Sequence, residues 1–201
     1  MNQVQTLFNK LSACGPAKEW AKGQTDLESA WINCKRSDWM IWLLRELKFK
    51  DAKFYRLYAC WCVRNTPIEN GKVVWDLLTD IRSKNAVEVA ENYIAGFATI
   101  EELRIAKNDA NAAANAAYAA DAYAADAANA AADAVYADAA ANAAYAAANA
   151  AADAAANAVY AANAYAADAR LFAKKVQSDY IKTQISFETV KNLIVNRCNN
   201  D

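Results

Sequence analysis

The feature that most constrains the fold of this chain is the segment 110–169, which consists mainly of alanine. It contains 39 Ala, 13 Asn or Asp, six Tyr and two Val, and nothing else. Ala has the highest intrinsic helix propensity, and no Gly or Pro interrupts the run. A straight helix of this length would span about 90 Å, whereas a compact domain of this size measures about 40–45 Å across. We therefore expect two or three Ala-rich helices folded back on one another, with a turn near residues 136–138 or 146–152.

The rest of the composition favours a fold made wholly of helices. The 201 residues include only four Gly and two Pro, too few for the tight turns of a sandwich or barrel, and 56% are hydrophobic. The sequence predicts an all-α fold, a compact multi-helix bundle with an Ala-rich helical hairpin or stack. We expect a single helical domain over 1–201. It has a Trp-rich part at 1–107, low-complexity helices at 108–169 and C-terminal helices at 170–201.

Local signals place several helix ends in the Trp-rich part. Ser, Thr and Asp side chains cap helix N-termini, and Gly favours the position after a helix. The expected features are a capping box at Thr25–Glu28, a cap at Ser37, a helix over about 51–64, a helix that begins at Ser83 and ends at Gly96, and a second capping box at Thr99–Glu102.

A short pattern repeats within the alanine run. Asn or Asp, three residues, Asn or Asp, two residues and Tyr occur in that order four times, and the repeats end at Tyr118, Tyr136, Tyr145 and Tyr160. Positions i, i+4 and i+7 lie within about 60° of one another on a helix, so each unit presents one polar face tipped by Tyr. This face either joins neighbouring helices through hydrogen bonds or forms a recognition surface for a protein partner.

Compartment and cofactors follow from the cysteines and the N-terminus. The five Cys are an odd number, and the first residues show no signal-peptide pattern, so we expect reduced thiols in cytoplasm. No stretch is long and apolar enough to predict a membrane helix. Cys60 and Cys62 lie too close together for a usual zinc site, so we expect buried thiols, no metal site and no cofactor.

Charge is segregated along the chain. All 22 Lys and Arg and 17 of the 23 Asp and Glu lie outside the alanine run, which gives the flanks +5 and leaves six Asp inside. The chain as a whole carries −1, and such a balance does not predict binding to nucleic acid. The basic flanks are expected to attract or pack against the acidic run. The sequence also allows a homo-oligomer.

Several motifs carry a resemblance to a known family. They are Ala13–Ala17 with Trp20, Ala30–Trp31, Cys34–Leu44, Tyr58–Arg64, Asp80–Glu91 and Gly96, followed by the Ala-rich tract. In this order they are similar to the predicted all-α immunity proteins of bacterial polymorphic toxin systems and to related uncharacterised phage proteins. The resemblance implies an all-α cytoplasmic protein, in the host cell cytoplasm if phage-encoded, that acts in biological conflict by binding and neutralising a target.

No catalytic constellation is visible, so we expect no catalytic residues and no enzyme. His is absent, and there is no nucleotide-binding glycine loop and no nucleophile elbow. The first hypothesis is therefore a non-enzymatic binding protein that neutralises a toxin or a host defence component by sequestering it. The Tyr face of the alanine run is its candidate partner surface, because Tyr gives a large contact area at low entropic cost.

The second hypothesis is a phage counter-defence protein that sequesters a nucleotide immune signal. Its candidate ligand-binding residues are Asp38, Trp39, Trp42, Trp61, Arg82 and Ser83. Arg82 and Ser83 at a helix N-terminus would hold phosphate, and a Trp would stack a base. The alternative is that the Trp side chains belong to the core and that Arg82 forms a surface ion pair. A third hypothesis, an ice- or surface-binding Ala-rich protein, rests on alanine content alone.

Overall fold

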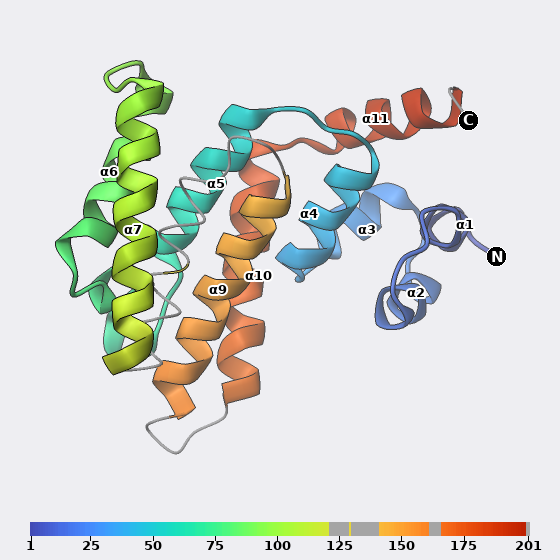
Figure 1. The fold of residues 1–201 in the computed structure, drawn as a ribbon. Coiled ribbons are helices and arrows are strands. Elements are labelled where there is room, and N and C mark those ends of the chain that lie inside the picture. The colour runs from blue at the N-terminus through green and yellow to red at the C-terminus, as the bar shows by residue number, and fades with distance from the viewer. Residues whose placement is uncertain (121–128, 130–140, 161–165, 200–201) are drawn as a thin grey trace.

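The computed structural model describes residues 1–120, 129, 141–160 and 166–199. Within these residues the chain forms ten α-helices and two 3-10 turns, and no strand (Figure 1). One isolated bridge, between Pro67 and Val73, closes the loop after α5. The prediction of an all-α fold is confirmed.

The helices follow one another through short connections. They are α1 (Gln3–Lys10), α2 (Gly15–Lys22), α3 (Leu27–Asn33), α4 (Ser37–Glu46), α5 (Ala52–Asn65), η1 (Glu69–Gly71), η2 (Val74–Leu77), α6 (Ile81–Ala95), α7 (Ile100–Ala120), α9 (Ala141–Tyr160), α10 (Ala166–Gln184) and α11 (Phe187–Asn199).

The Ala-rich helix α9 lies in the middle of the bundle. It packs side by side with α10 and also contacts α5 and α4 (Figure 1). Its buried face is made of methyl groups, which let the helix axes approach closely. The residues of this face are Ala148, Ala151, Ala152, Ala154 and Ala155, each at most 2% exposed.

The alanine run is therefore folded rather than extended, as the sequence predicts. α7 and α9 are separate helices, and α9 returns alongside α10 (Figure 1). The expected turn near 146–152 is wrong, because these residues lie within α9. The alternative turn near 136–138 lies outside the described residues.

Two groups of helices flank this centre. α6 contacts both α5 and α7, while α1, α2, α3 and α11 gather beyond α4 at the end that holds both termini (Figure 1). Fully buried large side chains join the layers, namely Tyr55 and Tyr58 from α5 and Met40, Ile41 and Leu44 from α4. None of the described helices has the combined length and apolarity that a membrane span needs.

The predicted helix ends are partly confirmed. Thr99 and Glu102 form the expected capping box, with Glu102 accepting from the Thr99 amide at 2.6 Å and Thr99 accepting from the Glu102 amide at 3.2 Å. Asp51 caps α5 by accepting from the Phe54 amide at 2.8 Å. Gly96 ends α6 in the left-handed conformation, at φ 83°.

Three predicted caps are wrong, because an adjacent residue or the interior competes for them. Asp26, not Thr25, caps α3. The Ser37 hydroxyl donates to Gln177 Oε1 at 2.8 Å in the interior, and Arg36 is the residue that precedes α4. α6 begins at Ile81 behind an Asp80 cap, which leaves Ser83 buried inside the helix.

Candidate ligand-binding site

A charged cluster lies where α4 meets α10. Arg36 donates two hydrogen bonds to the Asp38 carboxylate, from Nε at 2.9 Å and from Nη2 at 2.6 Å. Lys174 Nζ donates to the same carboxylate at 2.9 Å from the other side. Asp38 and Lys174 are buried, whereas the Arg36 side chain is 32% exposed. Two cations share one anion, so the cluster has a net charge of +1, and Arg36 is the member that reaches the surface.

The protonation state of Asp38 follows from these contacts. Burial by itself would raise the pKa of Asp38, but hydrogen bonds from Arg36 and Lys174 outweigh it, so the pKa lies below its usual value of 3.8. Asp38 is therefore ionised at neutral pH and has two cationic partners.

An indole ring stacks on the guanidinium of Arg36. Its guanidinium lies over the Trp39 ring, 4.6 Å from the centroid. Trp39 in turn contacts Trp20, with the two ring centroids 5.7 Å apart. A guanidinium that is fixed by a carboxylate and stacked on an indole has little freedom left to lose when a ligand binds.

A surface groove opens on one side of this stack, and we call it the main groove. Its volume is about 680 Å³, within the range of small-molecule sites. Among the described residues that line it, three are cations and none is a carboxylate. The residues that line it are Trp20, Asn33, Lys35, Arg36, Trp39, Leu171, Phe172 and Lys175.

A smaller groove, which we call the side groove, is also lined by Arg36 and Trp39. Its volume is about 360 Å³. It shares Arg36 and Trp39 with the main groove. The residues that line it are Cys14, Ala17, Arg36, Asp38, Trp39, Trp42 and Arg45.

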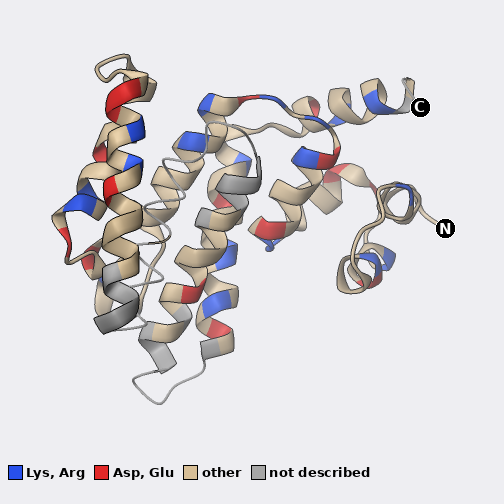
Figure 2. Cartoon of the chain, in the orientation of Figure 1, with Lys and Arg blue, Asp and Glu red and all other residues tan. Residues whose placement is uncertain are grey.

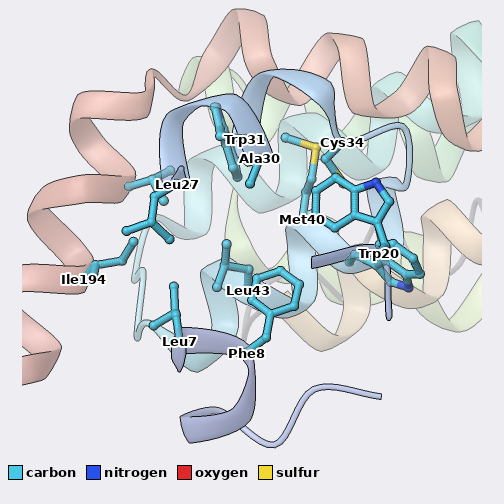
Figure 3. Close-up of a pocket in the computed structure, with 12 residues that line it drawn as sticks. Leu7, Phe8, Trp20, Leu27, Ala30, Trp31, Cys34, Met40, Leu43 and Ile194 are labelled. Atoms are coloured by element: carbon cyan, nitrogen blue, oxygen red, sulfur yellow. The ribbon is translucent and has the colours of Figure 1, made fainter. Parts of the chain in front are cut away.

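The interior next to Trp20 and Trp39 is closely packed. A cavity of only about 30 Å³ remains between α1–α4 and α11, and apolar side chains line it. Figure 3 shows Trp20 beside Met40 and Cys34 on one side of this cavity, with Phe8 and Leu43 below. The cavity is far too small for an organic ligand, whereas the main groove offers the space of a small-molecule site.

The structure brings together three of the six predicted ligand-binding residues. Asp38, Trp39 and Trp42 all line the side groove. Trp61 lies elsewhere, in the contact between α5 and α10, where its ring stacks on Tyr180 with a centroid distance of 4.2 Å. Trp61 therefore packs against the core, which is the alternative given above for the Trp side chains.

The expected grouping of Arg82 with Asp38 and Trp39 is wrong. Arg82 lies at the start of α6, on the opposite flank of the bundle from α4 (Figure 1). Its guanidinium pairs with Asp80, with Nη2 2.6 Å from Oδ2, which is the alternative of a surface ion pair. Ser83 follows it and is fully buried. The sequence placed a phosphate site here because Arg and Ser follow a helix start, but the capping Asp80 takes both the Arg82 amide and its side chain.

The predicted partner surface, the Tyr face of the alanine run, lies largely outside the described residues. Tyr118 belongs to α7, and Tyr145 and Tyr160 belong to α9. Their side chains, and the whole of Tyr136, lie outside the described residues, so the repeated Tyr face stays a prediction.

Buried thiols account for the Cys pair that suggested a metal. Cys60 and Cys62 are 2% and 0% exposed within α5, and burial raises the pKa of the Cys60 thiol to about 12. Burial likewise raises the pKa of the Cys34 thiol to about 11. In the described part of the chain, no three Cys, His, Asp or Glu side chains gather where they could hold a metal ion. Cys14 differs from these three because it is exposed, at the rim of the side groove.

Of the eight described residues that line the main groove, only Trp39 is among the predicted ligand-binding residues. Lys35 comes directly before Arg36, but Leu171, Phe172 and Lys175 lie on α10, more than 130 residues later. A signal existed, since Leu171 and Phe172 are the first large apolar residues after the alanine run and stand beside two lysines. Only the return of α10 along α4 shows that they share a surface with Trp39.

Charge also links the alanine run to its flank. α9 carries no Lys or Arg, whereas α10 carries four such residues along its length (Figure 2). Asp153 of α9 pairs with Arg170 of α10, with Oδ1 2.8 Å from Nε. This is the attraction between acidic run and basic flank that the sequence predicts.

Comparison with protein-family models, with curated proteins and with solved structures finds no match to this chain.

Proposed function

We propose that this protein is a non-enzymatic binding protein that sequesters a nucleotide-like anion in the main groove. The observation that carries the proposal is the combination of Lys35, Arg36 and Lys175 with Trp39 and Phe172 around one open space of about 680 Å³. Cations attract phosphate, and aromatic or guanidinium planes stack on bases. In the conflict between phage and bacterium that the resemblance implies, holding such a ligand would remove an immune signal.

The charges of the groove are available to a ligand. Lys35 is exposed, and within the described part of the chain no carboxylate pairs with it. Among the described residues, Lys175 pairs with the half-exposed Asp179, at 2.8 Å, and such surface pairs contribute little energy. Phe172 is 55% exposed, so more than half of its surface is accessible to a ligand.

Isothermal titration calorimetry with a panel of nucleoside mono-, di- and triphosphates and dinucleotides tests the proposal. Lys35→Glu and Phe172→Ala change exposed side chains and leave the core intact. Each is expected to lower the affinity about tenfold or more, through charge reversal and loss of stacking. Arg82→Ala is the matched control, a cation on the opposite flank, and it should bind as wild type does. If no member of the panel binds, or if Arg82→Ala alone abolishes binding, the proposal is wrong.

A protein partner, either a toxin or a defence component, is the second candidate. The observation that favours it is the neighbouring pair Leu171 and Phe172, which are 51% and 55% exposed on α10. Exposed apolar side chains of this size beside a polar rim are typical of interaction surfaces. Affinity capture from the native host with wild type and with the double variant Leu171→Ser/Phe172→Ser separates the two candidates, because a specific protein partner would be lost from the variant.

The Tyr face of the alanine run belongs to this second candidate. Replacing Tyr118, Tyr136, Tyr145 and Tyr160 by Ala should reduce partner affinity with little change in melting temperature if the face is a recognition surface. If the face only stabilises the bundle, the melting temperature should fall and the affinity should stay.

The third hypothesis, ice or surface binding, gains no support from the described helices. It requires a regular exposed face of alanines, but the methyl groups of α9 from Ala148 to Ala155 that the structure describes as buried face the interior. We do not propose it.

A further inference from the structure

Two grooves meet along a single wall, and this arrangement predicts the shape of the ligand. The main groove and the side groove share Arg36 and Trp39 as lining residues, and we call these two shared residues the wall. Their volumes, about 680 and 360 Å³, each fall within the range of a site for one small molecule or one part of a larger one. A ligand that fills both must cross the wall at Arg36.

Each groove has its own ring and its own cation. Phe172 and Lys35 belong to the main groove alone, whereas Trp42 and Arg45 belong to the side groove alone. Trp42 is half-buried against Phe8, with ring centroids 5.9 Å apart in an edge contact, so its position is fixed. Each groove thus has a planar ring and a cation of its own, although Asp38 also lines the side groove and Arg45 pairs there with Glu46, with Nη2 2.9 Å from Oε1.

The wall between them attracts an anion. Behind Arg36, the carboxylate of Asp38 is shared with Lys174, and the three residues together carry +1. Asp38 and Lys174 are buried, so this excess charge is presented to solvent through Arg36. An anionic group placed at Arg36 would neutralise this excess charge. The ion pairs of Asp38 would stay intact, because Arg36 uses only Nε and Nη2 to bind Asp38.

We infer that the ligand is a dinucleotide, with one base in each groove and the phosphodiester linkage at Arg36. The inference rests on the proposed function and extends it from nucleotides in general to one class. Linking two binding groups raises the affinity because the second binds as part of the same molecule, typically by 10²–10⁴-fold. A mononucleotide can use only one groove at a time.

The exposed Cys14 allows one groove to be closed without touching the other. Cys14 lines the side groove, whereas Cys34, Cys60 and Cys62 are buried and protected from a thiol reagent. In a Cys198→Ser background, a bulky maleimide should therefore label Cys14 alone, and mass spectrometry checks that one label is present. The unlabelled sample of the same protein is the control.

Calorimetry with adenosine monophosphate and with linear and cyclic adenine dinucleotides, before and after labelling, gives the test. We expect one dinucleotide per chain with an affinity about 100-fold above that of the mononucleotide, and we expect labelling to remove this advantage while mononucleotide binding persists. Arg45→Ala, on the side-groove rim, should weaken only the dinucleotide.

The outcomes separate the inference from the proposed function. Mononucleotide binding with no advantage for either dinucleotide, or an advantage that survives labelling, overturns the inference and leaves the proposed function standing. Absence of binding by all three ligands overturns both.

Discussion

At the scale of residues, few side chains hold Arg36 in place between the two grooves. Asp38 is the only anion among the residues that line either groove, as far as the described chain shows, and it has Arg36 and Lys174 as partners. Removing one partner of a buried ion pair costs far more than removing an exposed one, because a buried charge is left without compensation. The groove should therefore lose its shape when Asp38 is neutralised.

Asp38→Asn is expected to lower the free energy of unfolding by about 3 kcal/mol, because Lys174 stays buried without its counter-charge. Glu91→Gln, which breaks the half-exposed pair with Arg64, should cost about 1 kcal/mol or less. Urea unfolding at pH 7 compares the two variants. Equal losses would show that the Asp38 cluster contributes no more than a surface pair.

The stability difference between wild type and Asp38→Asn should depend on pH. Because the pKa of Asp38 is lowered below 3.8 in the folded chain, its ionised form stabilises the fold above that pH. This contribution is lost as the pH falls through the folded pKa. The difference in stability between wild type and Asp38→Asn should thus be largest near neutral pH and should shrink below about pH 4. A difference that grew on acidification would contradict the lowered pKa.

At the scale of elements, the sequence predicted what local chemistry determines and failed where the interior competed. The cap at Thr99 and the end at Gly96 depend on a few neighbouring residues, and both are confirmed. Ser37 has the right type for a cap, but its hydroxyl is used by Gln177, which is 140 residues away in sequence. The residues around Ser37 carry no information about a partner so far away in sequence, so the cap at Ser37 could not be excluded from the sequence alone.

The two helix-ending glycines give a matched pair. Gly96 has φ 83°, whereas Gly23 has φ −86° and room for a Cβ atom 3.7 Å from the Trp20 carbonyl oxygen. Gly96→Ala should destabilise the fold by about 1–2 kcal/mol, because L-residues resist the left-handed region. Gly23→Ala should be neutral or stabilising by about 0.4–1 kcal/mol. Thermal unfolding of both variants measures this, and equal shifts would contradict the assigned backbone conformations.

Close packing of α9 gives a second test at this scale. Ala151→Leu inserts a large side chain where the structure has none of its surface exposed, and it should cost about 1–3 kcal/mol. Ala167→Leu makes the same change at an exposed position of α10 and should cost much less. Guanidinium unfolding compares them. If Ala151→Leu were tolerated as well as Ala167→Leu, α9 would not be the central helix.

At the scale of the whole molecule, composition predicted the class of fold and topology determined the site. Scarce Gly and Pro and a long alanine run suffice for an all-α bundle that folds back on itself. The candidate site needed more, because the main groove joins Lys35 and Trp39 to Leu171 and Phe172 across the return of α10. The sequence predicts Asp38, Trp39 and Trp42 correctly as neighbours. It wrongly adds Arg82, because the sequence around a helix start does not show whether an Arg there binds a ligand or pairs with the capping Asp80.

The indole N–H signals of the six Trp test the central claim, that nucleotides bind between α4 and α10, most directly. In ¹H–¹⁵N spectra recorded with excess adenine dinucleotide, the signals of Trp20, Trp39 and Trp42 should shift, because these rings line the two grooves. Trp61 and Trp75 should stay in place, since Trp61 is stacked on Tyr180 and Trp75 lies under Arg64. Shifts confined to Trp61 or Trp75, or no shift of any indole at millimolar nucleotide, would contradict the account.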